Sequence, residues 1–306
     1  MPATPDLPRT RYFAWLYSPA PQRVLLQALF GIEREIGGSL RPGLDHHVAH
    51  SRLQWWREEC ERCAAGRPVH PLTRELVAAL TKVPGPPSHE PTAQPPERSL
   101  RPLSALVGLV DTAVWDLAGA TFESRRELTA YCERWSGAMI EPMAALTTLR
   151  ASTRTPTQYP DRDRGGAGRD WRALGAALRE LELLTDLARE ADAGRLRVPL
   201  DELELIGEHP GALARRPWPG AVAQLLTDRH EALRAAVARN LGDLDRPTQL
   251  ALRGVLVWIA LAWRLSRRAQ HELPHNIQPR RLDTICDAWS AWRAARWATT
   301  GRFRLE

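Results

Sequence analysis

The stretch that decides the fold class of this 306-residue chain is Leu174–Leu203, which reads LGAALRELELLTDLAREADAGRLRVPLDEL. Its apolar residues, Leu178, Leu181 and Ala188 among them, recur at the spacing of one helical face. We therefore expect a long helix with one packed side. Gly194 follows the periodic pattern, and glycine is common just past a helix C-terminus, so the helix should end there.

The same stretch carries a line of acidic residues. Glu182, Asp186 and Glu190 are spaced at i, i+4 and i+8, which places three carboxylates on one face over three turns. Like charges at this spacing repel each other by about 0.2–0.5 kcal/mol per pair. Two interpretations stay open at this point: the acidic face lies in water, or the carboxylates point at cations.

The composition of the whole chain agrees with a helical protein. Hydrophobic residues make up 43% of the sequence, which is ordinary for a globular protein. Runs of alternating β-branched residues are scarce, whereas Ala, Leu, Arg and Glu dominate. We predict an all-α fold, and the length suffices for one large helical domain or for two small ones.

The charge balance is basic. Formal net charge is +6 and the pI is about 9.7, carried by arginine rather than lysine. Such a balance suits acidic partners such as diphosphates, anionic lipid or nucleic acid. An arginine-rich composition also follows from a GC-rich genome, and composition alone does not separate the two explanations.

Cysteine and histidine patterns predict no metal site. Four cysteines do not make a disulfide framework, and the pair Cys60 and Cys63 lies within a predicted helix with no second pair after it. His46, His47 and His50 begin a predicted helix without acidic neighbours, so we expect surface or capping histidines. We find neither a signal peptide nor an apolar run approaching about 20 residues, and we expect a cytoplasmic protein, at most peripheral at the inner membrane.

The opening stretch resembles the squalene/phytoene synthase family. In that family a helix carries a glutamine, an asparagine and an Asp-x-x-x-Asp pair, followed by Gly-Arg and Leu-Pro. The chain follows this pattern without a gap from Gly175 to Pro199. Asp186 and Glu190 fall on the two metal-binding aspartates, so this second acidic motif is weakened. Gly194, Arg195 and Pro199 match, whereas Arg179 replaces the glutamine, Glu182 the asparagine, and Thr185 the arginine before the first aspartate.

The N-terminal part resembles the same family and then departs from it. Seven residues match its first helices: Arg11, Tyr12, Phe13, Ala28, Leu29, Phe30 and Arg34. Where active synthases carry their first Asp-Asp-x-x-Asp motif, this chain has Gly37, Gly38 and Arg41. The remaining acids nearby are Glu33, one turn earlier, and Glu35. A glutamate at the position of Glu35 resembles the non-catalytic branch of the family, the homologues of a complex I assembly factor.

Further matches extend the resemblance to about Arg11–Leu203. Gln54–Glu58 matches a Leu-Gln-Trp-Trp-Arg-Glu signature, and Asp111 and Asp116 occupy two further acidic positions that we expect to lie at the cavity. The resemblance implies an isoprenoid (terpenoid) synthase fold, a single helical bundle around a central cavity. We expect a disordered tail over residues 1–10, one domain over 11–306, a proline-rich surface loop over 84–98 and a second loop over 151–168.

The function implied by the resemblance is Mg²⁺-dependent head-to-head condensation of prenyl diphosphates. Because one metal-binding arm is missing, we expect a degenerate member, a lipid-binding or assembly-type pseudoenzyme that needs no cofactor. Its partners would be an isoprenoid or other lipid, or a protein, and not nucleic acid. The alternative is an active prenyltransferase with a rearranged site, in which Glu33 and Asp186 share Mg²⁺. In either case Arg34, Arg41, Arg179 and Arg195 are candidates for holding a diphosphate or other anion. The catalytic residues remain unknown.

The C-terminal part predicts three helices, near 218–240, 247–272 and 279–298. On the second, a buried stripe is expected from Leu250, Gly254, Val257 and Leu261. The last helix combines tryptophan with arginine: Trp289, Trp292, Arg293, Arg296 and Trp297. This combination suits a membrane headgroup interface. The interpretation that we favour has the tryptophans packing inward while the arginines reach outward.

Overall fold

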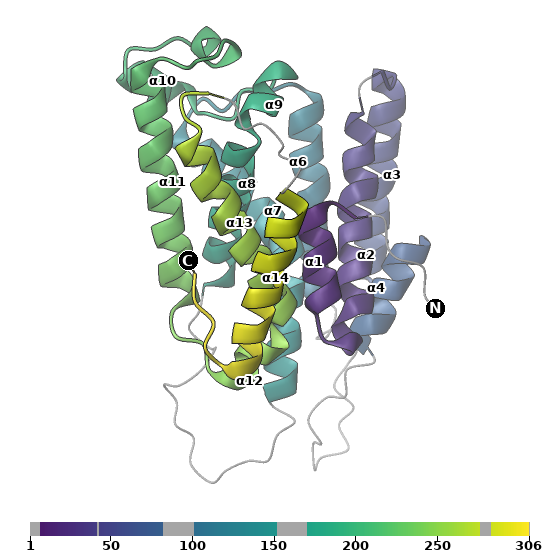
Figure 1. Ribbon diagram of the computed structural model, residues 1–306. Helices are drawn as coiled ribbons and strands as arrows, with labels where there is room; N and C mark the ends of the chain where they lie inside the picture. Colours follow the sequence, from purple (N-terminus) through teal and green to yellow (C-terminus); the bar gives the residue numbers. More distant parts are fainter. Residues whose placement is uncertain (1–6, 42, 82–100, 152–169, 276–282, 306) are drawn as a thin grey trace, which may run out of the picture.

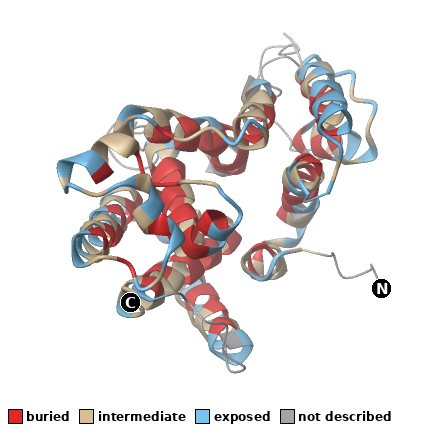
Figure 2. Ribbon diagram, turned by 90° about the horizontal axis from the view of Figure 1, so that it is seen from above, coloured by how far each residue is buried: buried red, intermediate tan, exposed pale blue. Residues whose placement is uncertain are grey.

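The computed structural model describes residues 7–41, 43–81, 101–151, 170–275 and 283–305. Within these ranges every regular element is a helix, as the sequence predicts, and the long helices run side by side as a bundle (Figure 1). The buried faces of the helices turn toward the interior of that bundle (Figure 2). The expected loops over 84–98 and 151–168 lie outside the described residues, except for Ala151, the last residue of a helix.

The helices follow one another in a simple order. The α-helices are α1 Arg9–Tyr17, α2 Ala20–Gly37, α3 His46–Ala64, α4 Pro71–Thr81, α6 Val107–Leu117, α7 Arg125–Ala151, α8 Trp171–Thr185, α9 Leu187–Asp192, α10 Leu200–Leu205, α11 Gly220–Leu241, α12 Arg246–Ala251, α13 Arg253–His271 and α14 Asp283–Thr300. Short 3₁₀ turns occupy η1 Gly38–Leu40, η2 Arg101–Leu106 and η3 Pro210–Ala214. Helix α1 begins at Arg9, so two residues of the expected tail are helical.

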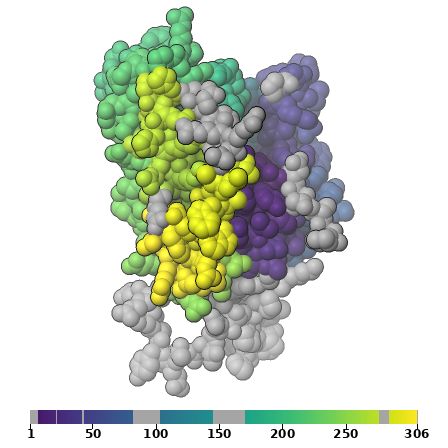
Figure 3. Space-filling model, viewed as in Figure 1, coloured from purple at the N-terminus to yellow at the C-terminus, as the bar shows by residue number. Residues whose placement is uncertain are grey.

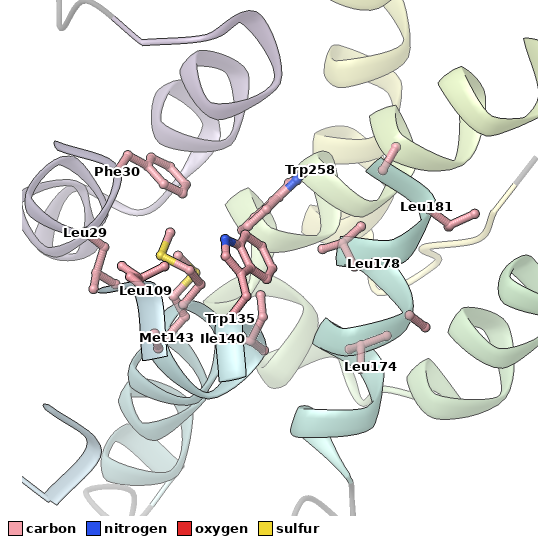
Figure 4. Close-up of a cluster of buried hydrophobic side chains, with 14 of the residues drawn as sticks. Leu29, Phe30, Leu109, Trp135, Ile140, Met143, Leu174, Leu178, Leu181 and Trp258 are labelled. Carbon is pink, nitrogen blue, oxygen red and sulfur yellow. The ribbon is translucent and has the colours of Figure 1, made fainter. Parts of the chain in front are cut away.

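Helix α8, from the opening stretch, lies in the middle of the bundle and packs against α7, α11 and α13. Its leucines are buried, and so is Ala188 on α9, as predicted. Leu178 faces Trp135 of α7 and Trp258 of α13, whose rings meet edge to face with centroids 5.7 Å apart (Figure 4). The interior is therefore filled by aromatic side chains at its centre.

The prediction of one continuous helix up to Gly194 is wrong at Asp186. Helix α8 ends at Thr185 and α9 begins at Leu187, so Asp186 lies between the two helices. The Thr185 hydroxyl donates a hydrogen bond to the Leu181 carbonyl at 2.7 Å, a back-bond that tends to bend helices. The predicted end at Gly194 is confirmed: its φ of +76° is one that glycine adopts without strain.

Two expectations about the C-terminal helices are also wrong. Gly254, Val257 and Leu261 are buried as predicted, but Leu250 is exposed because it belongs to α12, which ends before α13 begins. On α14 the inward face consists of alanines, whereas Trp289 and Trp292 are exposed. Small side chains let α14 approach α13 and α1 closely, and the large indoles are left on the outer face.

The close approach of α7 and α8 gives a test of this packing. A Cβ added at Gly175 would lie 2.6 Å from Ile140 Cγ1 and closer still to the Ser136 hydroxyl. We therefore expect Gly175→Ala to lower the free energy of unfolding by about 1–3 kcal/mol, because overpacking forces neighbours apart. Urea denaturation measures this value.

The matched control is Gly220→Ala. A Cβ there meets no atom within 4 Å, so this change should be neutral or slightly stabilising. Equal stability of the two variants would show that α7 and α8 do not pack as closely as described.

Candidate functional site

The site is built around a buried arginine. Arg11 of α1 is only 6% exposed and joins two carboxylates from two other helices. Its guanidinium donates to Glu33 of α2 at 3.1 and 3.2 Å, and to Glu182 of α8 at 2.6 and 3.1 Å. The two glutamates are thus held together by one cation.

Two tryptophans complete this junction. The Trp135 indole donates to Glu33 at 3.0 Å, and the Trp258 indole donates to Glu182 at 2.8 Å. The Arg11 guanidinium lies 3.8 Å from the Trp258 ring centroid, within cation–π range. Burial alone would raise the pKa of Glu182, but the charge and hydrogen bonds of Arg11 lower it overall. Each carboxylate therefore accepts hydrogen bonds from both a guanidinium and an indole. We call this five-residue group the Arg11 junction.

A cavity of about 590 Å³ opens beside the Arg11 junction, between α1, α2, α8, α13 and α14. Phe30, Ala262 and Leu265 supply apolar wall. The charged wall consists of five arginines and four carboxylates: Arg9, Arg11, Arg34, Arg179, Arg189, Glu33, Glu182, Asp186 and Asp287. We call it the first cavity.

A second cavity of about 330 Å³ lies next to the first and shares Arg179, Glu182, Asp186 and Arg189 with it. Gly37 and Arg41, from the segment after α2, also line it. The tertiary structure therefore brings the two predicted motif segments together around one space.

Glu190 is neutralised on the wall of the second cavity. Arg195 donates to its two oxygens at 2.8 and 3.1 Å, and Arg197 donates to Oε2 at 2.8 and 3.0 Å. Arg197 also bonds Asp116 at 2.7 Å, which in turn accepts from the Tyr131 hydroxyl at 3.0 Å. Burial favours the neutral acid, yet the hydrogen bonds and charges of Arg195 and Arg197 lower the pKa of Glu190 to about 2.

Asp186 is the acid of the second motif that stays most open to both cavities. Its side chain is 46% exposed and accepts from Arg189 at 2.6 Å. Burial is the main reason why its pKa is raised, and the charges of Glu182 and Glu190 act in the same direction.

Some of the remaining predicted site residues line a cavity, and others lie outside both cavities. Arg34 lines the first cavity, whereas Arg195 and Asp116 line the second. The expectation that Asp111 is a cavity acid is wrong: it bonds Arg57 of α3 at 2.5 Å and lines neither cavity. Glu35 is exposed near Arg52.

Other sequence candidates lie away from both cavities. Gly38 is part of η1 but not of either lining. Cys60 and Cys63 are buried, and burial raises the pKa of each thiol to about 12. His46 and His50 contact each other on the exposed face of α3.

Several residues of the site were missed by sequence analysis, among them Arg189, Trp135 and Trp258. Arg11 entered only as one of the matches to the family, and Arg197 was not singled out. Most of their carboxylate partners are distant in the sequence: Glu33 and Glu182 are 22 and 171 residues from Arg11, and Asp116 is 81 residues from Arg197. The one near partner is Glu190, which is 7 residues from Arg197. Only the fold brings these charges together.

The residues present do not fit Mg²⁺. Mg²⁺ requires oxygen ligands in near-octahedral geometry. Glu33, Glu182 and Glu190 instead accept hydrogen bonds from arginines, and Arg41 adds a cation where a ligand would be needed. A Cβ at Gly37 would meet no atom within 4 Å, so there is room for a carboxylate, but no oxygen ligand stands there. The described residues contain no group of three side chains that could hold a metal ion.

Comparison with known proteins adds an independent finding. A family model described as squalene/phytoene synthase matches residues 7–284. The fold is similar to a dehydrosqualene synthase crystallised with ligand, with a TM-score of 0.67 and 11% identity over 95% of this chain and 92% of that one. It is also similar to squalene synthase HpnC from Alicyclobacillus acidocaldarius, with a TM-score of 0.62 and 14% identity over 90% and 92%. No curated protein matches significantly.

The Arg11 junction predicts a large stability effect. Replacing Arg11 by Met leaves Glu33 and Glu182 without the cation that they share, so we expect the free energy of unfolding to fall by about 3–5 kcal/mol. The control is Arg9→Met on the same helix, which removes a half-exposed guanidinium while the buried Asp287 keeps its ion pair with Arg264, so the change should cost less than about 1 kcal/mol. Chemical denaturation compares them, and equal losses would contradict the central role of Arg11.

The lowered pKa of Glu190 predicts a pH dependence. The pKa falls from about 4.5 in the unfolded chain to about 2 in the folded one. The group therefore contributes stability above its unfolded pKa, and this contribution is lost as the pH falls toward 2. Between about pH 6 and about pH 3 the loss should be about 2 kcal/mol. Glu190→Gln should show a shallower acid dependence in urea denaturation, and an unchanged slope would contradict the assignment.

Proposed function

Because the chain belongs to the squalene/phytoene synthase family, we propose that it is a non-catalytic member that binds a lipid with an anionic head in its two cavities. A ligand of isoprenoid type fits this description. One observation carries the proposal: the acids of the site are already neutralised by arginines of the same chain, above all by Arg11, Arg195 and Arg197.

The electrostatics of the cavities argue against ionising an allylic diphosphate. That reaction needs strong stabilisation of the departing diphosphate, which in metal-dependent enzymes is supplied by bound cations. Removing a single charge-stabilising group from an active site costs about 10²–10³ in rate. This chain lacks an entire arm of acidic ligands, and its remaining glutamates are bonded to guanidinium groups. Condensation therefore has no support from the residues present.

Binding of an anion is supported by the same walls. Each cavity is lined by five arginines against four carboxylates, and Arg179 and Arg189 belong to both. Guanidinium groups bind phosphate and carboxylate oxygens through two parallel hydrogen bonds. The first cavity, of about 590 Å³, has the size of a small-molecule site, and Phe30, Ala262 and Leu265 offer contacts to a hydrocarbon chain.

A second candidate function is an active prenyltransferase with a rearranged diphosphate site. The observation that favours it is Asp186, whose carboxylate faces both cavities and is paired only with the largely exposed Arg189 among the interactions described. In this case the arginines would take over charge stabilisation from a metal. The two candidates differ in whether diphosphate is released.

An activity assay separates the two candidates. We expect purified protein incubated with farnesyl or geranylgeranyl diphosphate and Mg²⁺ to release no more diphosphate than a blank, and the Asp186→Ala variant to behave in the same way. Diphosphate release that Asp186→Ala abolishes would contradict the non-catalytic proposal and support the second candidate.

Binding of an anionic lipid is tested in the absence of metal ions. Farnesyl diphosphate in the presence of EDTA should raise the melting temperature of the protein. Arg189→Gln should weaken binding about ten-fold, the equivalent of one charge-assisted hydrogen bond. The control Arg74→Gln, an exposed arginine of α4 outside both linings, should leave binding unchanged. Binding that requires Mg²⁺, or that responds equally to both variants, would contradict the proposal.

A further inference from the structure

The outer face of α14 carries a row of large apolar side chains. Ile285, Trp289 and Trp292 follow one another at i, i+4 and i+7 and are 66%, 59% and 45% exposed. The two indoles stack on each other with ring centroids 4.9 Å apart. Arg296 continues the row one turn later and is also exposed. We call these four residues the α14 stripe.

The α14 stripe is not needed for packing inside the bundle. The opposite face of the helix consists of Ala291, Ala294, Ala295 and Ala298, all buried. Helix α14 lies on the molecular surface beside α1, with its outer face uncovered (Figure 3). Grouped tryptophans exposed in this way mark an interaction site more often than scattered apolar residues do.

The charges along the α14 stripe are mostly positive. Over residues 284–305 there are four arginines, Arg293, Arg296, Arg302 and Arg304. The single acid in this segment, Asp287, is buried and bonded to Arg9 and Arg264. Helix α14 begins with Asp283, and from residue 284 to residue 305 the exposed surface is apolar and cationic.

Two arginines of this segment also contact a tryptophan ring. The guanidinium groups of Arg293 and Arg304 lie 4.9 and 4.7 Å from the Trp297 ring centroid. This arrangement places positive charge at the level of the indoles. A membrane interface has the matching order, with anionic headgroups at the depth where tryptophan rings settle.

We propose that the α14 stripe docks this protein on an anionic membrane surface, with α14 lying in the plane of the headgroups. The partner is a lipid surface rather than a second protein because a cationic rim around exposed indoles complements anionic headgroups. None of the described helices is long and apolar enough to cross a bilayer.

Docking through α14 would also place the first cavity close to the lipid. Asp287 of the same helix and Leu265 of α13 line that cavity. The docking proposal rests on the α14 stripe alone, so it stands whether or not the cavity binds a lipid.

Cys286 offers a direct measurement of docking. It is the exposed cysteine, whereas Cys60, Cys63 and Cys132 are buried, so a thiol-reactive environment-sensitive fluorophore will label α14. We expect its emission to shift to the blue with vesicles of phosphatidylcholine and phosphatidylglycerol but not with phosphatidylcholine alone. Added salt should reverse the shift because it screens the arginines. Cosedimentation of unlabelled protein with the same vesicles checks that the label does not cause binding.

Substitutions in the α14 stripe test whether it is responsible for vesicle binding. Trp289→Ser with Trp292→Ser should lower the vesicle partition coefficient about ten-fold or more, since two apolar anchors are lost. Arg296→Gln and Arg302→Gln should each lower it about five-fold. The control Trp55→Ser removes an exposed tryptophan of α3 and should change nothing. Circular dichroism confirms that each variant is folded.

Three outcomes would overturn the proposal: no binding of the wild type to anionic vesicles, an equal loss in Trp55→Ser, or wild-type affinity in the double tryptophan variant. Light scattering in the absence of lipid tests whether a second copy of the protein binds the α14 stripe. A wild-type dimer that becomes a monomer in the double tryptophan variant would show that a second copy, not a membrane, covers the α14 stripe.

Discussion

A buried guanidinium between two carboxylates sets the constraint on which the rest of this structure depends. Arg11 cannot be left unpaired away from water, and neither can Glu33 or Glu182, because each isolated charge would cost several kcal/mol to bury. All three are satisfied only when α1, α2 and α8 meet in one arrangement. The indoles of Trp135 and Trp258 add α7 and α13 to the same point. Five helices are thereby held in register by one group of polar contacts.

The same pairing of arginines with carboxylates affects the capacity of the site to bind a metal ion. A carboxylate that accepts two or more hydrogen bonds from arginine has little capacity left for a metal ion. Glu182 is committed to Arg11, and Glu190 is committed to Arg195 and Arg197. The chain thus supplies from its own side chains the positive charge that a metal would bring. The fold of the squalene/phytoene synthase family is kept, while the donor set for Mg²⁺ is not.

The tryptophans at the centre of the bundle and those on α14 lie in opposite environments. Trp135 and Trp258 fill the centre of the bundle, and each of these two indoles donates a hydrogen bond to a glutamate there. On α14 the alanines occupy the packed face, and Trp289 with Trp292 remains outside. The difference follows from the space available, because α14 lies close against α13 and α1 and only small side chains fit between them.

The sequence by itself determined the fold class, the helix that ends at Gly194, and the likeness to a family, because periodicity and short motifs are local properties of the chain. It also brought out Asp186, Glu190 and the loss of acids at Gly37, Gly38 and Arg41. The tertiary structure alone decided which charges meet. Arg11 reaches Glu182 across 171 residues, Asp111 turns to Arg57 instead of a cavity, and the helix breaks at Asp186. The reason is that the partner of a charge, and the side of a helix that becomes buried, depend on neighbours that are distant in the chain.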